Sequence, residues 1–355
     1  MQILEFFYEN PPQSKELLHR KLSLDGQNTV IKGAKNSGKR SLILNYLANF
    51  DKEEFLFLNF EDLRFNEACL VNLKTFIQKK QANQIHKKLK IIIFYGVGKD
   101  FCYEFSPILE LTQCIVATEF LSLKLADFKE LLLDFLDFEE FISISKKNVP
   151  VNSQVGAFLQ NGRAFGVNLN EYLKAHFSQL DCEILRHIAR NLGAEFSTNE
   201  LYLRLKNNFK VSKDSLYKAI SELEDRGVVC FLNHSQKRIK KVYFRDFALK
   251  NALCIDKNFK QLFANVVFTE LLKLNTRLSY DKGFDFYLVR AKIAIILSPT
   301  LDLDLIKLRA KKMLAKALEL GILHIVFITL STEESFYEDG VKIDILPFDV
   351  WALGL

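Results

Sequence analysis

Short apolar runs alternate with helical patterns along the first third of the chain. The segment TVIKGAKNSGKRSLILNYL, which follows Asn28, has the pattern of a strand, a glycine-bearing loop and a helix. Further apolar runs follow at Phe55 to Phe60, Leu89 to Phe94 and Cys114 to Ala117, and helical patterns such as Ala68 to Lys79 separate them. This alternation predicts an α/β fold with a parallel sheet.

The pattern changes after Leu121. The segment LADFKELLLDFLDFEEFISIS places apolar residues at mixed spacings of three and four, which is typical of amphipathic helices. We therefore expect a helical lid or linker here, following the sheet.

Residues 178–250 have the pattern of three helices followed by a hairpin. The helices are predicted at Leu180 to Asn191, Ser197 to Phe209 and Ser212 to Arg226, and Gly227 ends the third. The segment VVCFLNHSQKRIKKVYF then gives two strand-like runs around a polar turn. Three helices and a hairpin, in this order, predict a winged helix.

The last segment mixes helices and strands again. It predicts helices at Asn258 to Lys273 and Leu305 to Leu320, and strands at Phe284 to Val289, Lys292 to Leu297 and HIVFITL. The chain ends in IDILPFDVWALGL. We therefore expect four parts, at residues 1–122, 123–177, 178–250 and 251–355.

Composition excludes several classes of protein. With 49% hydrophobic and 26% charged residues in 355, the chain is neither disordered nor fibrous. Apolar stretches such as Leu89 to Tyr95 fall far short of the roughly 20 residues that a membrane-spanning helix needs. The N-terminus lacks the pattern of a secretory signal, and the six cysteines form no CxxC pair and no metal-ligand spacing with histidine. We expect a soluble cytoplasmic protein with no bound metal and no membrane contact.

The glycine-bearing loop carries the clearest chemical motif. Gly33, Gly38 and Lys39 fit the pattern G-x-x-x-x-G-K-[ST], whose backbone N–H groups and lysine bind phosphate oxygens. Arg40 occupies the place of the hydroxyl that binds Mg²⁺, and Ser41 comes one residue late. The alternative is a tight turn that uses glycine for backbone reasons alone. The residues expected to bind ATP or ADP are Gly33, Asn36, Ser37, Gly38, Lys39, Arg40 and Ser41.

A nucleotide hydrolase of this kind also needs an acidic residue at the end of a later strand, to hold magnesium and orient water. The strand Ile91 to Phe94 is instead followed by Tyr95 and Gly96. The sequence therefore assigns no magnesium ligand and no catalytic residue. A displaced carboxylate would have to come from Glu61, Asp62 or Asp100.

The chain resembles the archaeal-type AAA ATPases of prokaryotes. That family has a P-loop domain, a winged helix and a C-terminal domain like the PD-(D/E)XK restriction endonucleases. The resemblance covers most of the chain and rests on GAKNSGK, LNFEDLR, IVATEF, LDFEEF and FLQNGRAFGV in the first half. In the second half it rests on KVYFRDFALKNAL, FANVVFTELL, FDF and ILPFDVWAL.

The chain also departs from that family. The resemblance implies Ser or Thr at Arg40, Asp at Tyr95 with an acidic neighbour at Gly96, and a Gly-Arg pair near Ala126 and Asp127, and all of these are missing. Asp285 is similar to the first metal-binding acid of the nuclease fold, but the strand that should carry acid-x-Lys is KIAIILSP. One carboxylate alone is not a nuclease site.

Positive charge is concentrated between Arg204 and Arg245. This segment holds eleven Lys or Arg against four Asp or Glu, a net charge of +7, whereas the whole chain carries +6. The pattern predicts contacts with duplex DNA from the third helix and the hairpin. The alternative is a solvated face of a structural winged helix that contacts proteins. The residues expected to bind DNA are Lys213, Ser215, Tyr217, Lys218, Lys237, Arg238, Lys240 and Lys241.

Together these features predict a DNA-associated, ATP-binding protein of the AAA family with weak or lost ATP hydrolysis and lost nuclease activity. One alternative is a non-catalytic assembly protein, a pseudo-ATPase that binds a protein partner or itself. Another is an active ATPase that uses one of the displaced carboxylates.

Overall fold

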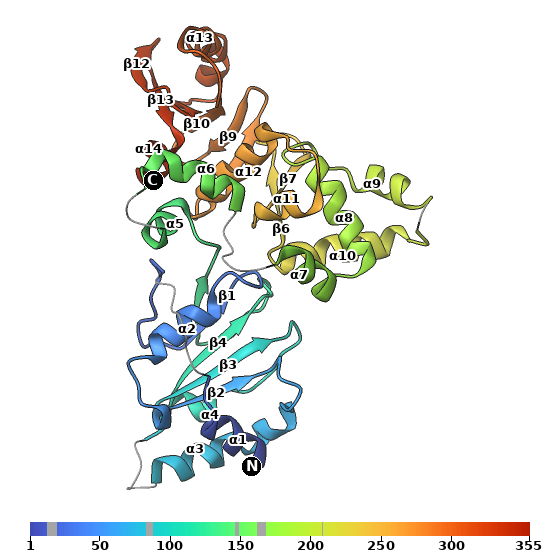
Figure 1. The fold of residues 1–355 in the computed structure, drawn as a ribbon, viewed down its shortest axis with the longest axis vertical. Helices are drawn as coiled ribbons and strands as arrows, with labels where there is room; N and C mark the ends of the chain where they lie inside the picture. The colour runs from blue at the N-terminus through green and yellow to red at the C-terminus, as the bar shows by residue number, and fades with distance from the viewer. Residues whose placement is uncertain (13–19, 83–87, 146–148, 162–167, 208) are drawn as a thin grey trace. The chain divides into compact units, whose positions relative to one another are not determined.

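The computed structural model describes residues 1–12, 20–82, 88–145, 149–161, 168–207 and 209–355. Residues 162–167 of the FLQNGRAFGV segment therefore lie outside the described part. The chain divides into two compact units, each described here by itself (Figure 1). The first unit comprises Met1–Phe135 with Asp225–Gly227, and the second comprises Leu136–Glu224 with Val228–Leu355.

The first unit is a five-stranded parallel sheet in the order β2-β3-β4-β1-β5, with helices on both faces (Figure 1). The predicted α/β fold with a parallel sheet is confirmed. Its elements are α1 (Gln2–Glu9), β1 (Thr29–Lys32), α2 (Lys39–Leu47), the 3₁₀ turns η1 (Lys52–Glu54) and η2 (Glu67–Asn72), β2 (Phe55–Asn59), α3 (Leu73–Ala82), β3 (Ile91–Val97), α4 (Ser106–Leu109), β4 (Gln113–Thr118) and β5 (Lys129–Leu132).

Alternate residues of the central strands enter two different cores. Ile31 and Ile93 pack with α2 on one face of the sheet. Val30 and Ile92 pack with α1 and α3 on the other face. Because both faces are covered, these strands are apolar at nearly every position, as is usual in parallel sheets.

The helical prediction for residues 125–145 is partly wrong. Lys129–Leu132 forms the edge strand β5, which pairs in parallel with β1. Most of its side chains stay exposed, so the strand lacks the buried alternation that would have revealed it. Helix α5 (Phe138–Ile144) begins later, at Asp137, whose side chain and that of Glu140 form a capping box.

The second unit contains a helical cluster and a six-stranded sheet. Its elements are α5, α6 (Val151–Asn161), α7 (Leu169–His176), α8 (Gln179–Arg190), α9 (Thr198–Leu205), α10 (Lys213–Asp225), β6 (Val229–Asn233), β7 (Lys240–Phe244), α11 (Ala248–Leu253), α12 (Phe259–Leu272), β8 (Leu278–Asp281), β9 (Phe284–Leu288), β10 (Ile293–Leu297), α13 (Leu303–Glu319), β11 (His324–Thr329), β12 (Glu334–Glu338), β13 (Val341–Pro347) and α14 (Phe348–Leu353). The three helices and the hairpin predicted between Leu180 and Phe244 are present as α8, α9, α10 and β6–β7.

The six-stranded sheet has the order β12-β13-β11-β10-β9-β8, with parallel pairs at its centre and antiparallel pairs at both edges. Helix α13 covers one face, while α12 and α14 pack in the core of the other. Trp351, the only tryptophan of the chain, lies in α14 beside Phe348. No helix among the described residues is both long and apolar enough to span a bilayer.

Candidate nucleotide and nucleic-acid sites

The loop between β1 and α2 requires glycine at two positions. A Cβ atom at Gly33 would lie 2.2 Å from the carbonyl oxygen of Leu133, so any side chain there would collide with backbone. Gly38, with φ of 96°, is the left-handed residue at which α2 begins. The loop is thus shaped so that its end leads directly into the N-terminus of a helix, which is where proteins bind phosphate.

Lys39 lies at the first position of α2 and folds back over the loop. Its Nζ atom donates hydrogen bonds to the carbonyl oxygens of Gly33 (2.6 Å) and Ala34 (2.8 Å). Burial lowers the pKa of this lysine to about 8, although Glu119 and Glu61 favour its charged form. The ammonium group thus bonds backbone carbonyls of its own loop. A phosphate would offer it charged oxygens, which are stronger acceptors.

Three other residues predicted to bind nucleotide, Asn36, Ser37 and Ser41, lie in different environments. Asn36 is exposed in the left-handed region (φ 67°), and Ser41 is half-buried. Ser37 Oγ is buried and has no hydrogen-bond partner among the described residues. The backbone carbonyl of Ser37 accepts a 2.6 Å hydrogen bond from Arg20, which also donates to the carbonyl of Asp134. Arg20 thus braces the loop, a role that sequence spacing does not suggest.

Arg40 points toward two aromatic rings. Its guanidinium carbon lies 5.9 Å from the ring centre of Phe57 and 6.0 Å from that of Tyr95, so it forms cation–π contacts with both. Burial raises the pKa of Tyr95 to about 12, which keeps its phenol neutral at physiological pH. At the two positions where the family resemblance implies a hydroxyl and a carboxylate for magnesium, the chain thus has a cation and a neutral ring.

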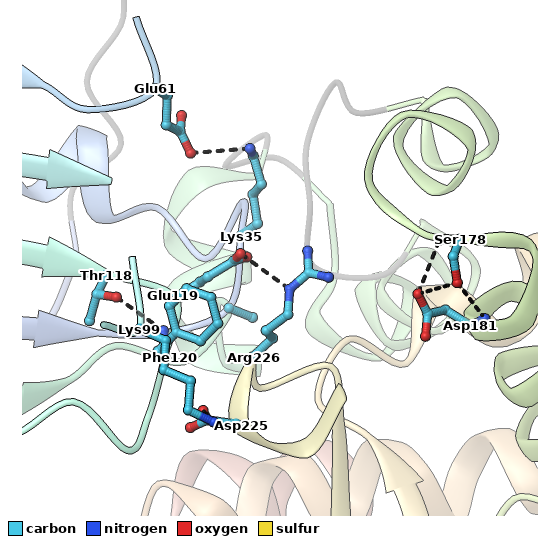
Figure 2. Close-up of polar contacts among 12 residues, drawn as sticks. Lys35, Glu61, Lys99, Thr118, Glu119, Phe120, Ser178, Asp181, Asp225 and Arg226 are labelled. Carbon is cyan, nitrogen blue, oxygen red and sulfur yellow. Dashed lines mark hydrogen bonds and ion pairs between the residues drawn. The ribbon is translucent and has the colours of Figure 1, made fainter. Parts of the chain in front are cut away.

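Carboxylates approach the loop from other strands. Glu61 follows β2 and receives a 3.1 Å ion pair from Lys35 in the loop (Figure 2). A Cβ at Gly96 would lie 2.7 Å from Glu61 Cγ, so the glutamate side chain crosses the space that Gly96 leaves empty. Glu119 follows β4, and both glutamates act electrostatically on Lys39.

Glu119 also marks a contact with residues far along the chain. Arg226 Nε donates to Glu119 Oε1 at 3.1 Å, and the neighbouring Asp225 pairs with Lys99 at 3.1 Å (Figure 2). Ser122 donates to Asp225 through both its N–H and its hydroxyl, each at 2.8 Å. Sequence reasoning missed Glu119. Its position directly after a predicted parallel strand could have revealed it, because ligands bind beyond the carboxyl ends of such strands.

The other two displaced carboxylates do not join this group. Asp62 accepts three hydrogen bonds from Arg64, and these hold the pKa of the aspartate at about 2. Asp100 is exposed. Of the three acids predicted as replacements, Glu61 is the one that the structure places against the loop.

The predicted DNA-binding residues fall into two groups in the second unit. Lys213, Ser215, Tyr217 and Lys218 are all exposed at the start of α10, where Ser215 hydrogen-bonds with Ser212 as part of the helix cap. The other group lies on the β6–β7 hairpin.

The four hairpin residues have different environments. Lys237 and Arg238 are exposed at the turn. Lys240 Nζ lies 3.5 Å from the ring centre of Phe231, whereas the half-buried Lys241 lies 4.5 Å from that of Tyr280. Because adjacent residues of a strand face opposite sides, Lys240 and Lys241 cannot serve one surface.

Asp285 lies on β9, where its Oδ2 atom accepts a hydrogen bond from the N–H of Leu297 at 2.8 Å. Burial raises the pKa of this carboxyl, while Lys241 and Arg309 partly oppose the shift. The described residues contain no group of three or more His, Cys, Asp or Glu that could hold a metal ion.

No family model matches the sequence, and a search of curated proteins found no match. Among solved structures, the chain is similar to the Walker-type ATPase PABY2304 of Pyrococcus abyssi, with 16% identity over 63% of this chain and 90% of that one and a TM-score of 0.42. It is also similar to the ORC1 protein of Aeropyrum pernix, solved in complex with DNA, with 14% identity over 67% and 89% of the two chains and a TM-score of 0.30.

A further similarity is with PH0952 of Pyrococcus horikoshii, a signal transduction ATPase with numerous domains and a tetratricopeptide repeat sensor. The identity is 12% over 74% of this chain and 47% of that one, with a TM-score of 0.29.

Proposed function

We propose that the chain is a DNA-associated protein of the AAA type that binds ATP or ADP through residues 33–41 and hydrolyses ATP weakly or not at all. The observation that carries this proposal is the loop itself. Gly33, Gly38 and the buried Lys39 form a tight turn that leads into the start of α2, which is the geometry that suits a phosphate group. The magnesium side of the same site holds Arg40 and Tyr95 instead of a hydroxyl and a carboxylate.

Arg40 supports nucleotide binding without a metal. Its guanidinium is one residue from Lys39, is exposed, and rests on the rings of Phe57 and Tyr95. A guanidinium can donate two parallel hydrogen bonds to a phosphate group, which gives both charge and orientation. We propose Glu61 as the acid that supports any residual hydrolysis, because its side chain lies against Gly96 and pairs with Lys35 of the loop.

Calorimetric titration of the full chain with ATP, in EDTA and in magnesium, tests this proposal. We expect saturable binding in EDTA that is lost in Lys39→Ala. Turnover is then measured with magnesium, with and without duplex DNA, for the wild type, Lys39→Ala and Glu61→Gln. The absence of saturable binding at millimolar ATP would overturn the proposal. Fast turnover that requires both Lys39 and Glu61 would instead establish an active ATPase.

DNA association is proposed for the region formed by α8, α9, α10 and the β6–β7 hairpin, which has the element order of a winged helix. The exposed cations at the start of α10 and at the hairpin turn support it. Replacing Lys237, Arg238 and Lys240 together by glutamine should weaken binding to duplex DNA. It should also make the slope of log affinity against log salt concentration shallower by up to about three, because each lysine or arginine lost removes about one phosphate contact. Unchanged affinity and salt slope in a fluorescence anisotropy titration would remove the hairpin from the DNA contact.

A second candidate is a non-catalytic assembly protein. Leu63 and Val71 in the first unit are 103% and 87% exposed, and large apolar side chains in such positions often mark contacts with other proteins. Analytical ultracentrifugation over a range of concentrations tests this candidate. A strict monomer whose behaviour is unchanged by Leu63→Asp would exclude self-association through this surface.

A further inference from the structure

The β6–β7 hairpin is fixed to the sheet of the second unit. The N–H of Ser235 donates to the carbonyl of Tyr280 on β8 at 2.8 Å, and the Ser235 hydroxyl donates to Asp281. At the other end of the hairpin, the side chain of buried Asn265 pairs with both the N–H (2.9 Å) and the carbonyl (2.7 Å) of Phe244. The hairpin is therefore a rigid wall, and the space between it and the sheet is preformed.

That space is a cavity of about 360 Å³, here called the hairpin cavity. Its walls carry Lys237 and Lys241 from the hairpin, Asp285 from β9 and Arg309 from α13. A second cavity of about 290 Å³, here called the helix cavity, shares Asp285 and Arg309 with the first. Volumes of this order suit small molecules rather than a nucleic acid duplex.

Lys241 and Arg309 offer free donors to the hairpin cavity. The Lys241 amine makes no hydrogen bond or ion pair with the described residues, although it lies 4.5 Å from the ring centre of Tyr280. Arg309 uses one nitrogen, Nη1, to bond the carbonyl of Leu297 and the hydroxyl of Ser298, each at 3.1 Å. Its other nitrogens make no hydrogen bond within the described part of the chain, so the guanidinium is held in place with donors to spare.

The acids of the cavity have other partners. Asp281 accepts from Ser235 and from the N–H of Lys282, and Lys316 lies 3.7 Å away. Glu195 accepts from the Tyr280 hydroxyl at 3.4 Å. Asp285 accepts from the N–H of Leu297. All three carboxylates are thus engaged with groups of the protein, whereas the amine of Lys241 makes no hydrogen bond or ion pair with the described residues.

The helix cavity supplies a different surface. Phe263 and Ala264 of α12 line it together with Leu297 and Leu301, and Lys260 is its one added cation among the described lining residues. A ligand that extended along Arg309, which lines both cavities, would have an anionic end beside Lys241 and an apolar end beside the half-buried Ala264 and Leu301. A mononucleotide has this division of charge and size.

We propose that these neighbouring cavities, which share Asp285 and Arg309 in their walls, together bind a small phosphorylated molecule of mononucleotide size, with Lys241 and Arg309 contacting its phosphate and the helix cavity holding its base. This site lies wholly in the second unit and is independent of nucleotide binding by residues 33–41. Lys241 then serves a small ligand, while Lys237, Arg238 and Lys240 remain the hairpin cations available to DNA.

Calorimetry on the full chain carrying Lys39→Ala tests the proposal, because this background separates the two sites. We expect AMP to bind saturably, adenosine to bind at least about tenfold more weakly, and inorganic phosphate to compete with AMP. Lys241→Met and Arg309→Gln should each weaken AMP binding by about tenfold or more, since each removes a charged donor to phosphate. Lys240→Met is the matched control, because this neighbouring lysine faces Phe231, and it should bind AMP like its parent.

Several results would overturn the proposal. They are the absence of AMP binding, equal affinity for adenosine and AMP, or unchanged binding in both Lys241→Met and Arg309→Gln. Binding of a 5′-phosphorylated oligonucleotide but not of AMP would assign the cavity to nucleic acid ends and refute the small-ligand assignment. If residues 33–41 bind no nucleotide, the wild type and Lys39→Ala will bind AMP equally, so the two proposals fail independently.

Discussion

Nucleotide binding should depend on pH through Lys39. Its pKa is about 8 in the free protein, because burial opposes the charge. The protonated fraction therefore falls from about nine tenths at pH 7 to about one tenth at pH 9. A bound phosphate favours the ammonium form, so the apparent affinity for ATP should follow that fraction and fall about tenfold over this interval.

The control is Lys39→Arg, whose guanidinium does not titrate in this range. We would measure the dissociation constant of ATP in EDTA at pH 7, 8 and 9 for both proteins. Any change in the charge of ATP itself affects both alike, so the comparison isolates the lysine. Parallel pH profiles for the two proteins would refute the reasoning, because they would show that Lys39 keeps its proton up to pH 9.

A second readout needs no ligand. The pKa of Lys39 is lower in the folded protein than in the unfolded chain, where it is near 10.5, so the unfolded state binds more protons between these pH values. The free energy of unfolding of the first unit should therefore rise with pH relative to that of Lys39→Met, by about 2 kcal/mol between pH 7 and pH 10. Urea titrations at the two pH values measure this difference, and a fall in relative stability would contradict the sign.

Two further predictions concern the same loop. Gly33→Ala should lower the free energy of unfolding by about 1–3 kcal/mol and abolish ATP binding, because the added methyl group would collide with the Leu133 carbonyl. Urea unfolding measures the first effect and calorimetry the second. A fully stable variant would show that the loop can shift to accept the methyl group. Arg40→Thr should make nucleotide affinity depend on magnesium, because it places a hydroxyl next to Lys39. Equal affinities of this variant in EDTA and in magnesium would show that the missing hydroxyl is not what limits metal binding.

The sequence predicted the central part of the first unit well for a physical reason. Strands buried on both faces are apolar throughout, so β1, β2, β3 and β4 stand out as short runs. The edge strand β5 was missed because its exposed residues follow no buried pattern. The loop that follows β1 was recognised because its glycines and lysine lie within seven residues of one another.

Other features depend on contacts between distant residues and leave no local pattern. Arg20 bonds the carbonyl of Asp134, and Arg226 reaches Glu119 from more than a hundred residues away. The separate environment of Lys241 arises because the hairpin is bonded to β8, through residues 45 positions apart. A count of positive charges treats Lys240 and Lys241 alike, whereas the fold places them on opposite sides of one strand.

Trp351 gives the molecule an optical label that belongs to one unit only. It is the sole tryptophan and packs beside Phe348 in the core of the second unit. Tryptophan emission therefore reports the unfolding of the second unit. Calorimetric unfolding, in contrast, responds to both units. Comparing the two signals therefore shows whether the halves of the chain melt together or in turn, without any dye, fusion or engineered residue.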